Sequence, residues 1–212
     1  MAIKGTIYGI NGPIILVRGN LGYQMNEMVY VGESRLIGEV IGLTSRETTI
    51  QVYEDTSGLK PKEPVEGTGG PICVTLAPGI LSNIFDGIER PLETIAKTSG
   101  AFIPTGACVD ALDRERLWET HLTVAVGDAV SGGSIIAEVR ETASIVHKVM
   151  LAPDISGEVV FAQPDGAYPI VQELVRIRTG EGKETGVCMM QKWPIRIPRP
   201  VGRRYPADRP LV

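Results

Sequence analysis

The chain has 212 residues, of which 43% are hydrophobic, and its formal net charge is −4. This length suffices for two or three small domains, and this hydrophobic fraction excludes an intrinsically disordered chain. The slight negative charge gives no indication of nucleic-acid binding. Because the sequence has neither an apolar run of about 18 residues nor a signal-peptide core in MAIKGTIYGI, we expect no membrane insertion and a cytoplasmic location.

Residues 1–70 consist of short apolar or alternating runs that glycine, asparagine or serine separates. The runs are GTIYGI, PIILVRG, MVYVG, RLIGEVIGL and TTIQVYE. Five or six strands without an intervening helix predict a small closed β-barrel, because closure leaves no exposed sheet edge. A barrel of this size is marginally stable alone, so we expect it to pack against a neighbour.

Residues 71–115 carry three helical signals, which predict a partial α/β segment. Five apolar residues follow Pro78 and Gly79 at helical spacing, namely Ile80, Leu81, Ile84, Phe85 and Ile88. Pro91 and Gly100 predict the start and the end of a second helix, and DRERLWET predicts a third. The first helix should present one apolar face. We expect self-association through it, or weak order in residues 71–115 and 189–212.

Residues 116–188 contain two similar halves, LTVAVGDAVSGGSIIAEV and HKVMLAPDISGEVVFA, each with a strand, a turn and a strand. They resemble the barrel-sandwich domains that carry biotin or lipoate on a lysine at a hairpin tip. Here Val146 stands at the tip position, and Lys148 lacks the flanking residues of a carrier lysine. We therefore expect an unmodified scaffold, with a carrier component of an enzyme as the weaker alternative.

Short motifs for nucleotide binding are incomplete in this sequence. GEGKET has Glu184 where a phosphate-binding loop needs serine or threonine, and Ile177 where it needs the first glycine. GTGGPI has Ile72 where a dinucleotide fingerprint needs its last glycine. We interpret both segments as turns and assign no cofactor-binding residue.

Nucleophilic and metal chemistry also lack a motif. Ser131 and Ser156 have no glycine-flanked elbow, and His121 and His147 have no ligand spacing. The three cysteines are far apart and form no CxxC pair, as expected for reduced thiols; they are Cys73, Cys108 and Cys188. We therefore predict no catalytic residue and no metal site.

The C-terminal segment is basic and rich in proline. Its six cations stand against the single acid Asp208, and they are Lys192, Arg196, Arg199, Arg203, Arg204 and Arg209. The prolines keep the backbone extended and are Pro194, Pro198, Pro200, Pro206 and Pro210. RNA binding is one interpretation, but the segment lacks interleaved aromatic residues for base stacking. A solvated or domain-crossing linker is the favoured interpretation.

Three segments together carry a family resemblance that runs from residue 1 to residue 212. GTIYGINGPIILVRG, LAPGILSNIFDGIERPL and MQKWPIRIPRPV closely resemble the catalytic A subunit of V-type and archaeal A-type rotary ATPases. The resemblance implies a crown β-barrel over 1–70 and the beginning of the α/β nucleotide domain over 71–115. It further implies an inserted bulge barrel over 116–188, and a return strand or linker over 189–212.

The resemblance also implies a function. The intact subunit would hydrolyse or make ATP, as Mg-ATP, at its interface with the B subunit, coupled to proton or sodium translocation. The family's phosphate-binding loop and catalytic glutamate match no position here, so we expect this chain alone to lack ATPase activity. The implied partners are the B subunit, through the crown, and the peripheral stalk, through 116–188, in a complex peripheral to the membrane. The alternative is a stand-alone double-barrel adaptor without nucleotide chemistry, which requires a complete core.

Overall fold

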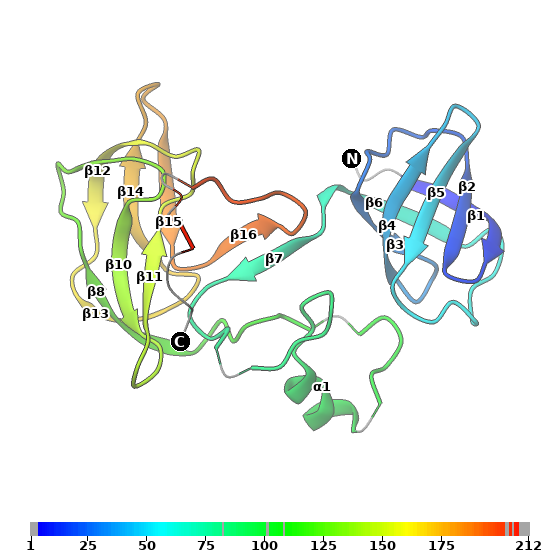
Figure 1. Ribbon diagram of the computed structural model, residues 1–212, viewed down its shortest axis with the longest axis horizontal. Coiled ribbons are helices and arrows are strands. Elements are labelled where there is room, and N and C mark those ends of the chain that lie inside the picture. The colour runs from blue at the N-terminus through cyan, green and yellow to red at the C-terminus, as the bar shows by residue number, and fades with distance from the viewer. Residues whose placement is uncertain are drawn as a thin grey trace.

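The computed structural model describes residues 4–81, 83–100, 102–107, 109–201, 204, 206 and 207. Figure 1 shows two β units, joined by a two-stranded ribbon, with a further segment and its short helix beside them. Cys108, Arg203 and the residues from 208 onward lie outside the described residues, and with them lie Asp208, Arg209 and Pro210 of the basic segment.

The N-terminal unit is a closed barrel with strand order β1-β2-β5-β4-β3-β6, and every neighbouring pair is antiparallel. Its strands are β1 (Lys4–Asn11), β2 (Ile14–Arg18), β3 (Glu27–Val31), β4 (Leu36–Leu43), β5 (Glu47–Val52) and β6 (Pro64–Pro71). Alternate side chains point inward, so that Ile15 and Val17 of β2 are buried in one core with Ile50 of β5. The predicted small closed barrel is confirmed, and we call this unit the barrel.

The second unit, which we call the sandwich, has two four-stranded sheets in the orders β11-β10-β8-β13 and β15-β14-β12-β9. Its strands are β8 (Leu117–Leu122), β9 (Ala129–Val130), β10 (Ile135–Arg140), β11 (Val146–Met150), β12 (Gly157–Ala162), β13 (Gly166–Pro169), β14 (Glu173–Arg178) and β15 (Glu184–Cys188). Ile136 and Val149 of the first sheet share a core with Val159 and Leu174 of the second. The prediction of a mostly β chain with a barrel-sandwich unit is therefore confirmed.

Two antiparallel strands, β7 (Cys73–Leu76) and β16 (Gln191–Pro194), form the ribbon between the units. The chain leaves the ribbon at Leu76 and returns at Gln191, and these two residues are register partners. The helix α1 spans Leu92–Ser99, after Pro91 and before Gly100, whose φ is +76°. Proline suits the start of a helix and glycine tolerates this φ, so the second predicted helix is confirmed.

The first predicted helix, over Ile80–Ile88, is wrong. Gly79 has a φ of +109°, and the described residues that follow form turns and an isolated β-bridge between Phe85 and Pro91. The side chain of Asp86 accepts hydrogen bonds from the backbone N–H groups of Ile88 and Arg90, which caps a turn instead.

Without that helix, its five apolar residues do not share one face. Ile80 and Phe85 pack against the sandwich core, whereas Ile84 is 60% exposed. Leu81 is also exposed, and Ile88 is half-buried. Self-association remains a prediction, but the helical face that motivated it does not form.

The third predicted helix, DRERLWET, is also wrong, because β8 begins at Leu117. Asp113 accepts hydrogen bonds from the backbone of Glu115 and Arg116, which forms a turn before the strand. In β8, Trp118 and Thr120 are buried while their neighbours are exposed, so the burial alternates with a period of two. Burial of this alternating face against the sandwich core overrides the local helical preference.

Candidate functional site

Lys148 lies in the middle of β11, where it pairs across the ladder with Glu138 of β10. The tip of the β10–β11 hairpin is formed instead by residues 141–145, between the two strands. A carrier lysine must stand at a tip so that its prosthetic arm can swing. The position of Lys148 is that of an exposed ladder residue.

The GEGKET segment begins in the connection between β14 and β15 and ends in the first two residues of β15. The N–H of Thr179 donates to the carbonyl of Lys183, and the N–H of Gly182 donates to the carbonyl of Thr179. Its backbone groups therefore hydrogen-bond within the turn, and a strand rather than a helix follows at Glu184. Anion cradles of the phosphate-loop kind open a helix, whose N–H groups face the phosphate. The geometry is that of a hairpin turn.

Each histidine has a single acidic neighbour. His121 Nδ1 lies 2.6 Å from Asp165 Oδ2 at an exposed position, and His147 Nδ1 lies 3.3 Å from Glu141 Oε2. Within the described ranges, no three His, Cys, Asp or Glu side chains are grouped so that they could hold a metal ion. These pairs are suited to fixing side-chain orientation rather than to binding a metal.

The remaining singled-out residues are also apart from one another. Ser131 lies between β9 and β10, and Ser156 immediately precedes β12. Cys73 and Cys188 are half-buried free thiols on β7 and β15.

The described part of the chain also contains no helix with the length and apolarity needed to cross a bilayer.

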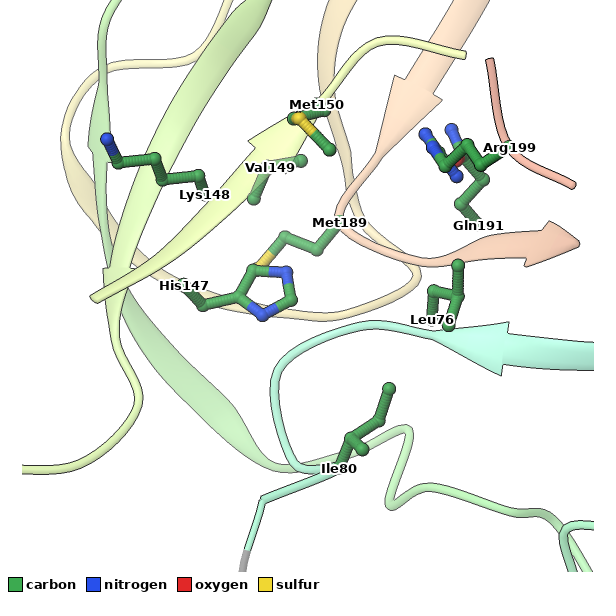
Figure 2. Close-up of a pocket in the computed structure, with 9 residues that line it drawn as sticks. All are labelled: Leu76, Ile80, His147, Lys148, Val149, Met150, Met189, Gln191 and Arg199. Carbon is green, nitrogen blue, oxygen red and sulfur yellow. The ribbon is translucent and has the colours of Figure 1, made fainter. Parts of the chain in front are cut away.

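A cavity of about 250 Å³ lies between β11 and the ribbon (Figure 2). Met150 and His147 approach it from β11, Leu76 from β7 and Gln191 from β16. Arg199 stands at one side of the cavity and also lies over the Trp193 ring, 4.8 Å from its centroid. The cavity therefore lies where β11, the ribbon and the chain after β16 meet.

Glu141, the first residue after β10 in the β10–β11 hairpin, binds the segment that follows β7 and thereby fastens it to the sandwich. Its side chain is 3% exposed, and Oε1 accepts hydrogen bonds from the N–H groups of Gly79, at 2.7 Å, and Leu81, at 3.1 Å. Oε2 lies beside His147. The carboxylate therefore satisfies two backbone N–H groups that would otherwise lack a protein acceptor.

A second carboxylate, Glu54, fastens the barrel to the segment that contains α1. It follows β5 and accepts hydrogen bonds from Arg90 Nη1, at 3.0 Å, and from the N–H of Gly106, at 2.9 Å. Arg90 and Glu54 are both largely buried, with side chains 11% and 7% exposed. Burial alone would raise the pKa of Asp86, but the Arg90 backbone and guanidinium hold that pKa below its usual value.

A third carboxylate, Glu39 of β4, binds the chain that follows β16. Arg196 donates to both oxygens of Glu39 in a bidentate pair, and the Tyr53 hydroxyl donates to Oε2. The Glu39 side chain is 2% exposed. The Arg196 guanidinium is the main cause of its lowered pKa, because it favours the ionised carboxylate.

Glu39, Glu54 and Glu141 therefore form junctions between parts of the chain that are far apart in the sequence. Sequence reasoning found none of Glu39, Glu54 and Glu141, because an isolated glutamate carries no spacing pattern. One signal was nevertheless present in RLIGEVIGL, where Glu39 interrupts an otherwise apolar strand. A charge at a buried strand position needs a partner, and here the partner is Arg196.

Comparison with known families agrees with both folded units. The family model for the ATP synthase alpha/beta family beta-barrel domain matches residues 7–69. The model for the ATPsynthase alpha/beta subunit barrel-sandwich domain matches residues 109–196. The chain belongs to the ATP synthase alpha/beta family.

Within this family, the similar proteins belong to A-type and V-type enzymes. The V-type ATP synthase alpha chain of Halothermothrix orenii is 48% identical over 209 residues, which is 99% of this chain and 35% of that protein. The A subunit of the A-type ATP synthase of Methanosphaera stadtmanae is 48% identical over 210 residues, which is 99% of this chain and 36% of that protein. For the corresponding A-type protein of Pyrococcus horikoshii, the identity is 44%, over 100% of this chain and 22% of that protein. The chain thus spans about a third, or less, of the length of these relatives.

Proposed function

We propose that this chain is the N-terminal, non-catalytic part of the A subunit of a V-type or A-type ATP synthase, and that its role is assembly. The observation that carries this proposal is the near-complete coverage of the chain by relatives with that name. The order of the units agrees with it, since the closed barrel precedes the barrel-sandwich unit.

In this proposal, the barrel packs beside the barrels of B subunits in the crown of the head, and the sandwich contacts the peripheral stalk. The complex lies on the cytoplasmic side, peripheral to the membrane. Hydrolysis or synthesis of ATP, with Mg-ATP as cofactor and coupled to proton or sodium translocation, belongs to the whole protein. The fastening carboxylates serve assembly, because they hold the chain segments between the two units.

A groove of about 460 Å³ on β1 and β2 is the part of the barrel surface best suited to a neighbouring barrel. Its walls include Tyr8, 52% exposed, and Leu21, 47% exposed, beside the cations Arg18 and Lys62. The Arg18 guanidinium stacks on the Tyr8 ring, 4.0 Å from its centroid. Exposed aromatic and apolar side chains next to arginine are typical of protein interfaces.

Capture by the purified B subunit tests this proposal. The chain with Tyr8→Ser and Leu21→Ser should lose B-subunit capture, whereas Phe161→Ser with Val171→Ser, at exposed positions of the sandwich, should retain it. Capture of stalk proteins should instead depend on the sandwich. If the unaltered chain captures neither the B subunit nor stalk proteins, the assembly role is wrong.

Calorimetry with Mg-ATP tests the non-catalytic part of the proposal. We expect no heat of binding, because the GEGKET turn hydrogen-bonds to itself and leads into a strand. A dissociation constant in the low micromolar range, which corresponds to about −8 kcal/mol, would contradict this expectation.

One observation favours the second candidate, a stand-alone double-barrel adaptor. The barrel and the sandwich each have a core of their own, and none of the described residues belongs to both cores. An adaptor would bind its partner without any requirement for a B subunit. Ring assembly with B subunits on mixing separates the candidates, because only the A-subunit role predicts it.

A further inference from the structure

The covalent connection between the barrel and the rest of the chain is short. β6 ends at Pro71 and β7 begins at Cys73, so that Ile72 alone separates the barrel from the ribbon. The Ile72 carbonyl accepts a hydrogen bond from the N–H of Ile195, at 3.1 Å. Because the barrel core is complete in itself, a change of backbone angles at this point would move the barrel as a rigid body.

Two carboxylates of the barrel, Glu54 and Glu39, connect it to later parts of the chain through side-chain contacts, and we call them the two latches. The Glu54 latch holds Arg90 and the N–H of Gly106, while its other oxygen lies 3.4 Å from the N–H of Ile37 in the barrel. The Glu39 latch holds Arg196. Both latches stand on the barrel, and both of their partners belong to later parts of the chain.

The surface around the Glu54 latch is incompletely packed. A cavity of about 210 Å³ is lined by Tyr30 and Ile37 of the barrel and by Gly106 and Ala107. Gly106 lies against the carbonyl of Ser34, so that a Cβ on Gly106 would overlap the carbonyl oxygen. Small and polar interfaces between domains allow relative motion unless specific contacts prevent it.

We propose that the barrel is a rotatable unit which the two latches hold in one orientation, and which swings about Ile72, still folded, when they open. The side chains of Glu54 and Glu39 are 7% and 2% exposed, so opening a latch leaves a buried carboxylate without its cation, which is strongly unfavourable. Both latches fix the same rigid body, and opening one therefore weakens the other. The contacts all lie within this chain, so the device is independent of the assembly proposed above.

The coupling between the latches is the first test. Glu39→Gln weakens one latch without touching the contacts of Glu54, and amide hydrogen exchange is then measured at Gly106 in the full chain. We expect exchange at Gly106 to become at least about tenfold faster, while amides in the barrel core keep their protection. Glu66→Gln is the matched control, because Glu66 pairs with Lys4 and Arg35, which both lie in the barrel unit, and its exchange should equal that of the unaltered chain.

A second variant opens the interface without removing a charge. Gly106→Ala forces the loop away from Ser34. Gly182→Ala is the control, because the φ of Gly182, +79°, is similar to the +69° of Gly106, whereas a Cβ on Gly182 would meet open space. Small-angle scattering should show a larger maximum dimension for Gly106→Ala and for the double variant Glu39→Gln/Glu54→Gln. The Gly182→Ala control should have the same maximum dimension as the unaltered chain. Unchanged scattering in both would overturn the proposal. So would loss of protection throughout the barrel core, since the latches would then hold its fold rather than its orientation.

Discussion

Replacing Glu141 by alanine should destabilise the sandwich selectively. The change removes the acceptor of two backbone N–H groups at a side chain that is 3% exposed. A hydrogen bond to a charged group contributes about 1.5–3 kcal/mol, and the half-buried Gly79 should lose about this amount. Leu81 is 39% exposed, so its N–H can turn to water and adds less than about 1 kcal/mol. We therefore expect a loss of about 2–4 kcal/mol.

Urea unfolding followed by tryptophan fluorescence measures this loss. The two tryptophans of the chain, Trp118 and Trp193, lie on β8 and β16, so their fluorescence does not report on the barrel. With an m-value of about 2 kcal/mol/M, the midpoint should fall by about 1–2 M. Glu158→Ala, at an exposed position of β12, is the control and should leave the midpoint unchanged. If the two variants have the same midpoint, Glu141 does not fasten the segment and the reasoning is refuted.

Three further predictions concern exposed and ionised side chains. Ile84→Ser should reduce self-association in sedimentation without lowering the melting temperature, whereas Phe85→Ser should cost about 1–3 kcal/mol, because Phe85 packs on the sandwich core. Because Arg196 lowers the pKa of Glu39, this pair stabilises the fold above the ordinary glutamate pKa, and its stabilisation is lost as the pH falls through the lowered pKa. In Arg196→Gln, the free energy of unfolding should therefore depend less steeply on pH in the acid range. Intact mass from cells should show Lys148 unmodified, and a biotinyl or lipoyl mass would contradict the scaffold role.

Local sequence was sufficient for the barrel and for α1. In β5, Ile50 and Val52 are buried while Gln51 between them is exposed, so the alternation follows directly from the letters IQV, since the inner face of a closed barrel meets the core and the outer face meets water. Pro91 and Gly100 predicted the helix between them because each restricts or permits a particular φ, independently of tertiary contacts.

Local sequence misled us where distant parts of the chain determine the packing. Ile80 and Phe85 belong to a set with helical spacing, but both pack on the sandwich core, and Glu141, far along the chain, binds the N–H groups of Gly79 and Leu81. No window of the sequence around Ile80 contains that information. The period of two in LWETHL was visible in the letters, but the charged run before it favoured a helix.

The junction carboxylates could not have been predicted for a related reason. Glu39 and Arg196 are separated by most of the chain, and their pairing exists only after the barrel closes and β16 returns. Charged residues that approach each other through tertiary structure have no fixed spacing. A single sequence therefore indicated that Glu39 needed a partner, but not which cation supplied it.

The pairing of Leu76 with Gln191 has a consequence for how the chain folds. The ribbon encloses the whole sandwich within one loop of the chain, and joining the ends of a long flexible loop costs conformational entropy that grows with the logarithm of its length. If the sandwich folds first, its own structure brings residues 77 and 190 together. The two strands of the ribbon then pair at little further cost in conformational entropy. Deleting residues 77–190 and joining Leu76 to Gln191 by a short turn should therefore leave a hairpin beside an intact barrel, as in the excision of a self-contained insertion.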